Sequence, residues 1–130
     1  MKITRFFATE DGGSRFVDID IPIEHAQKDS DGHTLRLSNA YTSANVRFVE
    51  LPEGMSQTWH NAPARQVVVV LAGTLEVGTT DGQTRQWHAG EAFLADDTTG
   101  KGHVTRTVGG PARVMFAPLP EGFAIERWSV

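Results

Sequence analysis

The chain has 130 residues, a formal net charge of -4 and no cysteine. This length suits one domain with one core, and the lack of cysteine excludes disulfides, thiolate ligands and thiol nucleophiles. The mild charge and the scattered lysines and arginines exclude nucleic acid and an anionic membrane as partners. Without repeats or a linker, we expect one domain over residues 1–130.

The start of the chain bears on its location. Met1 to Phe6 lacks the apolar stretch of a secretory signal, and no apolar run reaches the roughly 20 residues that cross a bilayer. Together with the missing cysteines, this predicts a soluble, cytoplasmic protein.

The amino-terminal part is typical of short strands separated by turns. Ile3–Phe7 and Phe16–Ile23 flank a turn-rich segment at 10–14, so we expect an opening hairpin. Pro22–Ser30 is polar and predicts at most a single helical turn. An Asp-Gly turn then precedes a short strand at Thr34–Ser38.

The central and carboxyl-terminal parts continue the strand pattern. Val46–Leu51 ends at a Pro-Glu-Gly turn, and Gln66–Leu71 is apolar on both faces except at Gln66, as in a strand covered on both sides. Further strands are predicted at Thr74–Gly78, Thr84–Trp87, Ala92–Leu94, His103–Val108, Arg113–Ala117 and Phe123–Trp128. Strands spaced about 8 to 12 residues apart, with no long amphipathic helix, predict a sandwich or barrel.

Two motifs carry a resemblance to the cupin superfamily. Gly54, His60, Gln66 and Gly73 match its first motif: glycine, five residues, His-x-His, three or four residues, glutamate, six residues and glycine. Ala62 replaces the second histidine of that motif, and Gln66 replaces the glutamate.

The second cupin motif runs glycine, five residues, Pro-x-Gly, two residues, histidine, three residues and asparagine. Gly90 to Asp96 is similar to its start, and His103 and Thr107 to its end, while the segment between carries two extra residues. The resemblance spans about residues 45 to 118. It implies an all-β fold, a single cupin-type jelly-roll barrel, and a cupin-like domain covering the chain.

The resemblance also implies a site in the barrel lumen. His60, Gln66 and His103 fall on the metal-ligand positions of the two motifs, so the resemblance implies a divalent metal, Fe, Mn, Ni or Zn. No organic cofactor is expected. In the alternative reading, both histidines are satisfied barrel residues, and Gln66 is hydrogen-bonded to one of them.

Other polar candidates favour structural roles. Asp96 and Asp97 are adjacent on a strand and should point to opposite faces, which argues against a catalytic carboxylate pair. Thr98 to Gly102 lacks the spacing of a phosphate loop and favours a tight turn that aims His103 inward. Three further histidines lie in polar stretches and are expected in solvent: His25, His33 and His88.

Several side chains could line a ligand pocket. The apolar candidates are Trp59, Trp87, Trp128, Phe48, Phe93 and Met115. The arginines that could hold a substrate carboxylate are Arg47, Arg65, Arg106 and Arg113, and the sequence leaves open which of them face inward.

Two functions follow from these observations. The first is a metal-dependent enzyme, similar to oxygenases or isomerases, that acts on a small organic acid or aromatic compound. The alternative is a non-catalytic cupin that binds a small ligand and has a degenerate metal site. Because cupins are frequently dimers, the resemblance also implies a homodimer, with an apolar face at Phe6, Phe7, Ile19 and Ile21 as the candidate contact.

Overall fold

The structure, a computed structural model, describes residues 1–129. These residues form short strands and one turn of 3₁₀ helix. In chain order they are β1 (Lys2–Ala8), β2 (Ser14–Asp20), β3 (His25–Lys28), β4 (Thr34–Leu37), β5 (Arg47–Leu51), β6 (Ser56–His60), β7 (Gln66–Ala72), β8 (Thr74–Gly78), β9 (Thr84–His88), β10 (Ala92–Asp96), β11 (His103–Thr107), β12 (Ala112–Pro118) and η1 (Ile125–Trp128). The all-β fold predicted from the sequence is confirmed.

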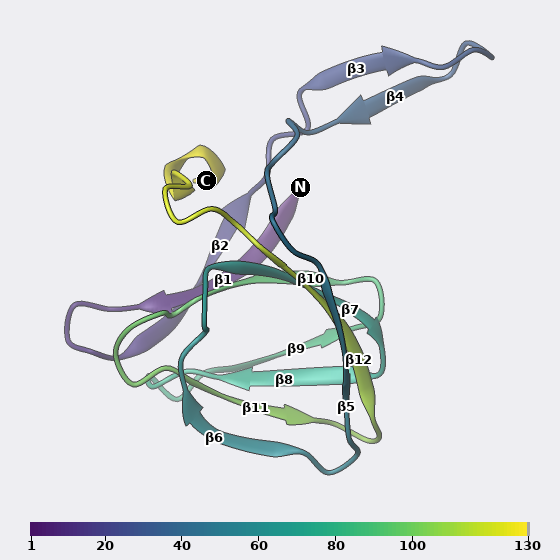
Figure 1. The fold of residues 1–130 in the computed structure, drawn as a ribbon. Coiled ribbons are helices and arrows are strands. Elements are labelled where there is room, and N and C mark those ends of the chain that lie inside the picture. The colour runs from purple at the N-terminus through teal and green to yellow at the C-terminus, as the bar shows by residue number, and fades with distance from the viewer. Residues whose placement is uncertain (130) are drawn as a thin grey trace.

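Two facing sheets make the barrel. One has six strands in the order β2-β1-β10-β7-β12-β5, and the other has four in the order β6-β11-β8-β9. Figure 1 shows them as two facing layers, with the large sheet above the small one. The strand pairing is antiparallel except between β1 and β10. This arrangement is the jelly roll that the sequence resemblance implies.

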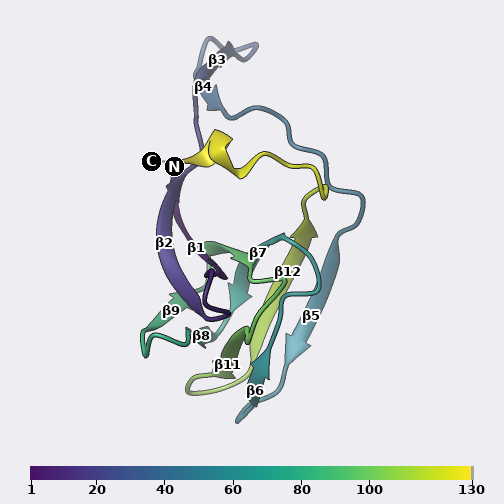
Figure 2. The ribbon, with the colours of Figure 1, turned by 90° about the vertical axis from the view of Figure 1, so that its left-hand side faces the viewer.

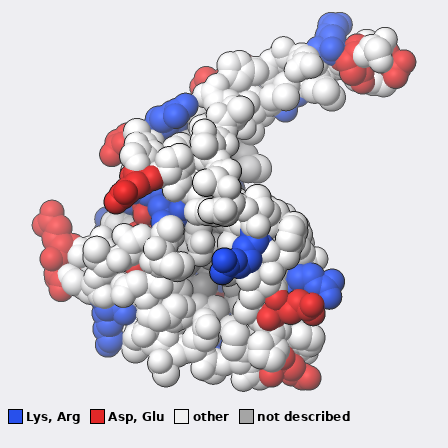
Figure 3. All heavy atoms as spheres, in the orientation of Figure 1, with Lys and Arg blue, Asp and Glu red and all other residues white. Residues whose placement is uncertain are grey.

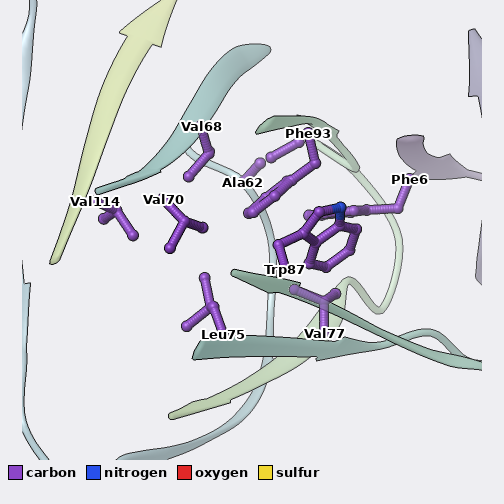
Figure 4. Close-up of a cluster of buried hydrophobic side chains, with 10 residues drawn as sticks. Phe6, Ala62, Val68, Val70, Leu75, Val77, Trp87, Phe93 and Val114 are labelled. Atoms are coloured by element: carbon purple, nitrogen blue, oxygen red, sulfur yellow. The ribbon is translucent and has the colours of Figure 1, made fainter. Parts of the chain in front are cut away.

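Strand β7 shows how the sequence divides between the two faces of the large sheet. Val68 and Val70 are buried in the cluster between the sheets, which Figure 4 shows with Phe6, Trp87 and Phe93. Val67 points the other way and packs against a second cluster outside the barrel. The apolar run thus serves two cores, which is why it lacks alternation.

The second cluster lies beneath the carboxyl-terminal segment. Trp128 is 2 % exposed and packs with Leu94 and Ile19 on the outer face of the large sheet. Ion pairs between Asp96 and two arginines also stabilise this region. Buried Asp96 accepts hydrogen bonds from Arg5 and Arg65, and Arg65 also donates to the carbonyl of Phe123 at 2.6 Å.

Two local predictions were wrong. Phe123–Trp128 is not a strand but includes a 3₁₀ turn, because both edges of β12 are already occupied by β7 and β5 and no sheet edge is left beside it. Pro22–Ser30 contains strand β3 instead of a helical turn, since His25–Lys28 pairs with Thr34–Leu37. The 3₁₀ turn is the only helical segment within residues 1–129, and no helix there is long and apolar enough to cross a membrane.

The proposed amino-terminal contact face is also not available. Phe6 is 1 % exposed in the inner core, and Ile19 and Ile21 are buried under the carboxyl-terminal segment. Only Phe7 of that set is partly exposed, and the guanidinium of Arg5 stacks over its ring. Three of the four residues of that face are therefore already buried within the chain.

We predict that Asp96→Asn destabilises the protein strongly. It would leave two arginines without their carboxylate in a half-buried place, which typically costs about 3 kcal/mol. Asp18→Asn is the matched control, because Asp18 forms an exposed ion pair with Arg85 and should lose less than about 1 kcal/mol. Urea unfolding measures both, and equal losses would show that the buried group does not hold the fold.

Candidate functional site

Strand pairing brings two histidines together inside the barrel. His60 ends β6 and His103 begins β11, and the antiparallel register sets these two residues opposite one another. Their ring centroids are 4.3 Å apart, with the planes inclined by 54°. His103 is buried and His60 is half-buried. The structure therefore places the two predicted histidines side by side.

Hydrogen bonds define the tautomer of each ring. The Nδ1–H of His60 donates to the carbonyl of Thr58 at 2.7 Å, and the Nδ1–H of His103 donates to the carboxylate of Asp97. Since these acceptors hold the Nδ1 protons, each neutral ring keeps an unprotonated Nε2.

Neither Nε2 atom has a hydrogen-bond partner within residues 1–129. Among these residues, Trp128 Nε1 is the only enclosed side-chain polar atom without a partner, so neither Nε2 atom is fully enclosed. Both nitrogens are thus available to a ligand.

Asp97 is the site residue that sequence reasoning missed. It is 0 % exposed, and its carboxylate contacts both His103 and the backbone N–H of Ala62. Asp96 points to the opposite side, toward its arginines, so the predicted divergence of the two carboxylates is seen. The presence of a carboxylate a few residues before a candidate ligand histidine could have indicated this role, because such histidines usually donate their second ring N–H to an acceptor.

The loop before His103 is shaped by glycine. Gly102 has φ +85°, and a Cβ placed there would lie 2.0 Å from the carbonyl oxygen of His60. Asn61 closes the same loop, because its side-chain amide donates to the carbonyls of Thr99 and Gly100. These contacts support the predicted tight turn ahead of His103.

A cavity of about 600 Å³ occupies the lumen next to the histidines. Its walls are mostly apolar and include Phe93, Val68 and Phe116, and His60, Gln66 and His103 all line it. Figure 3 shows a hollow on this face of the molecule with a basic side chain at its rim. Such a volume suits a small molecule.

Gln66 contributes a neutral donor and acceptor. It begins β7, is 9 % exposed, and has no side-chain hydrogen bond within residues 1–129. The alternative in which Gln66 bonds to a histidine is therefore not seen. Ala62, where the cupin motif has its second histidine, is 4 % exposed and packs in the apolar cluster (Figure 4).

Of the four candidate arginines, only Arg47 lines the cavity. Arg65 pairs with Asp96, Arg113 with Glu50 at 3.6 Å, and Arg106 with Glu76. The hydrogen bonds from Arg106 and Gln86 hold the pKa of Glu76 below its usual value. Arg47 is the single charged residue of the cavity lining and has no ion-pair partner within residues 1–129.

Most of the predicted pocket aromatics lie elsewhere. Phe93 lines the cavity, but Trp87 is behind it in the core and Trp128 belongs to the outer cluster. Trp59 and Phe48 are exposed on the surface. Phe6, a candidate for the amino-terminal contact face, lines the cavity instead.

The remaining histidines are exposed, as expected: His25, His33 and His88. Among residues 1–129, the one cluster of three acidic or histidine side chains close enough to share an ion is Asp29, Asp31 and His33, at the tip of the β3–β4 hairpin. Asp29 accepts the backbone N–H of Asp31 and of His33, so turn formation accounts for this grouping.

We predict that His60 and His103, in their neutral forms, both carry the proton on Nδ1. The reason is that a carbonyl and a carboxylate hold these protons. Long-range ¹⁵N–¹H correlation spectra separate protonated from unprotonated ring nitrogens. In Asp97→Asn only His103 should change its pattern, and an Nε2–H tautomer for either histidine in the parent would contradict the assignment.

Comparison with known proteins agrees with this architecture. Residues 47–118, more than half of the chain, match the family model described as "Cupin domain". No curated protein matches the chain.

Several solved structures are similar in fold. Protein NMB1881 of Neisseria meningitidis is 21% identical, with a TM-score of 0.47 over 62% of this chain and 84% of that one. An RmlC-like cupin of Shewanella frigidimarina is 24% identical, with a TM-score of 0.40 over 61% and 71% of the two chains. The epimerase RmlC of Legionella pneumophila is 13% identical, with a TM-score of 0.45 over 88% and 70%. On the match to its domain model, the chain belongs to the cupin family.

Proposed function

We propose that the lumen of this cupin binds a small organic acid beside a divalent first-row metal ion. His60, Gln66 and His103 would hold the ion, and Arg47 would hold the carboxylate of the acid. One observation carries this proposal: a single cavity joins two imidazoles with available Nε2 atoms to an arginine that has no ion-pair partner among residues 1–129, and the cavity lining contains no acidic residue.

The charge in the cavity supports an anionic ligand. Arg47 is exposed at the mouth of an otherwise neutral cavity, so its guanidinium can form a bidentate contact with a carboxylate. The apolar walls would enclose the body of the acid. Because Arg47 is exposed, its guanidinium would meet the carboxylate at the mouth while the apolar part of the acid lies deeper in the cavity.

The donors fit a divalent ion. Histidines that bind metals usually donate their second ring N–H to a carbonyl or carboxylate, as His60 and His103 do here. Gln66 adds an available carboxamide oxygen. When bound, the ion would act as a Lewis acid on the ligand. All three donors are neutral, so the carboxylate of the ligand would balance the charge, and we expect ion and acid to bind cooperatively.

A second function has specific support. Ala62 removes one cupin ligand, and Gln66 removes the only carboxylate of the family's ligand set. A cavity of this kind could bind the organic acid through Arg47 and the two imidazoles without metal or catalysis. Elemental analysis of untagged protein purified without added metal separates the two functions.

We predict that Arg47→Gln weakens binding of benzoate by about tenfold, the effect of losing one charge-assisted contact. Isothermal titration calorimetry measures it. Arg113→Gln is the matched control, because Arg113 is exposed on neighbouring β12 but pairs with Glu50. Benzamide should bind more weakly than benzoate to the parent, and equal binding of the two would contradict a carboxylate site.

We predict that Ala62→His combined with Gln66→Glu tightens divalent metal binding by at least about tenfold. One added unit charge near the ion contributes more than about 1 kcal/mol at an effective dielectric constant of about 20. The imidazole must fit a filled space, at a risk of about 1 to 3 kcal/mol in stability. Circular dichroism checks the fold.

The measurement is a titration of stripped protein with Mn²⁺, Ni²⁺ and Zn²⁺. Gln57→Glu is the control, because it adds the same charge at an exposed position of the cavity lining. A folded double variant that binds no tighter than this control would exclude the metal site and leave the metal-free function.

A further inference from the structure

The proposed metal ligands lie at one end of the barrel lumen. His60 and His103 are strand partners in the small sheet. The ring centroid of Phe6 is 4.7 Å from that of His103, and Phe6 pairs with Ala95, which in turn pairs with Gln66 of the large sheet. Gln66 therefore lies level with the two histidines.

Arg47 lies further along the lumen. It pairs with Phe116 on β12, whereas Gln66 pairs two residues later on that strand. Beyond Arg47 on β5, Val49 and Leu51 also line the cavity. The four residue steps from Arg47 to Leu51 span about 13 Å at about 3.3 Å per residue. The cavity thus continues past Arg47, away from the metal ligands.

The far part of the cavity is lined by aliphatic side chains from both sheets. Val114 pairs with Val49, and Leu75 lies on β8 in the small sheet, opposite the last residue of β11. We call Val49, Leu51, Leu75 and Val114 the aliphatic end. Figure 4 shows Val114 and Leu75 on the opposite side of the inner cluster from Phe6, the residue that packs on His103.

Loop contacts close the aliphatic end. The hydroxyl of Thr107 donates to the carbonyl of Pro52 at 3.0 Å and accepts the backbone N–H of Met55 at 3.1 Å, which binds the β5–β6 loop to the end of β11. Gly73, with φ +79°, lets the β7–β8 turn pack against the carbonyl of Pro111. Figures 1 and 2 show the β5–β6 and β11–β12 connections at the same end of the barrel. The lumen is therefore blind at this end.

The aliphatic end offers apolar surface to a ligand. Val114 and Leu75 are buried, while Val49 and Leu51 are half-buried and border the cavity. A hydrocarbon group gains by leaving water for such a surface. An apolar space offers water too few hydrogen-bond partners to hold it. Hydrocarbon is therefore the chemistry that fits this part of the lumen.

We infer that the acid bound in this lumen is an aliphatic carboxylic acid whose chain fills the aliphatic end. The inference rests on the proposed function, because it takes the carboxylate to lie at Arg47, near the metal ligands. From there the chain runs past Val49 toward Leu51, and the blind end limits its length. Val49 and Leu51 determine specificity, since they line one wall of the cavity at two depths.

Isothermal titration calorimetry of the parent protein with straight-chain carboxylates, from butanoate to decanoate, tests this inference. Each added methylene should tighten binding by about fourfold until the chain reaches the blind end, where the gain stops. The best member of the series should bind more tightly than benzoate. Equal affinity across the series, or benzoate binding more tightly than every member, would overturn the inference.

Two variants fill the aliphatic end at different depths. The longest chain that still gains affinity should be shorter in Leu51→Phe than in the parent, and shorter again in Val49→Phe. Glu50→Phe is the matched control, because Glu50 lies between these residues on β5 but is exposed and does not line the cavity. Circular dichroism checks each fold. Folded variants with the length profile of the parent would reject the assignment.

A spectroscopic measurement on the parent needs no substitution. In the complex with the best-binding carboxylate, nuclear Overhauser effects should join the terminal methyl group of the ligand to the methyl groups of Leu75 and Val114. Contacts of that methyl group with the ring of Phe6 instead would place the chain at the metal-ligand end and overturn the inference.

Arg47→Gln distinguishes failure of this inference from failure of the proposed function. It should weaken binding of every carboxylate by the same factor and leave the gain per methylene unchanged. If Arg47→Gln weakens binding but the series shows no gain, the aliphatic acid is rejected and the carboxylate site stands. If the gain is present but Arg47→Gln binds every carboxylate as tightly as the parent, the chain site is supported and the proposed carboxylate contact is rejected.

Discussion

The antiparallel pairing of β6 with β11 is the contact on which the site depends. It adds β6 to the small sheet and sets His103 opposite His60. The pairing needs a close backbone approach, which Gly102 permits because any Cβ there would meet the carbonyl of His60. The side-chain amide of Asn61 holds the loop before Gly102 by donating to the carbonyls of Thr99 and Gly100. The contacts that pair the two strands therefore also position the histidines.

Behind this pair lies a buried acceptor. Asp97 has no exposed surface, and its carboxylate both orients the His103 ring and accepts the backbone N–H of Ala62. Burying a carboxylate costs free energy unless hydrogen bonds satisfy its oxygen atoms. The positions of the loop, of the turn at Ala62 and of the imidazole therefore depend on one another. Loss of any one of them would disturb the others.

The sequence allowed prediction of the strands, the family and the proximity of the two histidines, because glycine turns and motif spacing are local signals. The role of Asp97 escaped prediction, because it lies in a segment longer than the family pattern and its partner depends on loop shape. The prediction of a strand at Phe123–Trp128 was wrong because of the tertiary structure, since β12 already has two neighbours in the sheet.

Strand β5 illustrates a different limit. Val46, Arg47 and Val49 all line the cavity, whereas Phe48 between them is 68% exposed. Alternation along this strand does not separate these residues, and only the structure shows that Arg47 lines the cavity while Phe48 points outward. A charged residue in the cavity lining beside an aromatic residue on the outer surface is the reverse of a simple core pattern.

Paramagnetic broadening by Mn²⁺ tests the central claim, a metal and acid site in the lumen, most directly. With benzoate present, substoichiometric Mn²⁺ should first broaden amide resonances around the cavity, such as those of Val68 and Thr105, and spare the exposed cluster at Asp29 and His33. Broadening that begins at the hairpin tip, with the cavity resonances unchanged, would contradict the account.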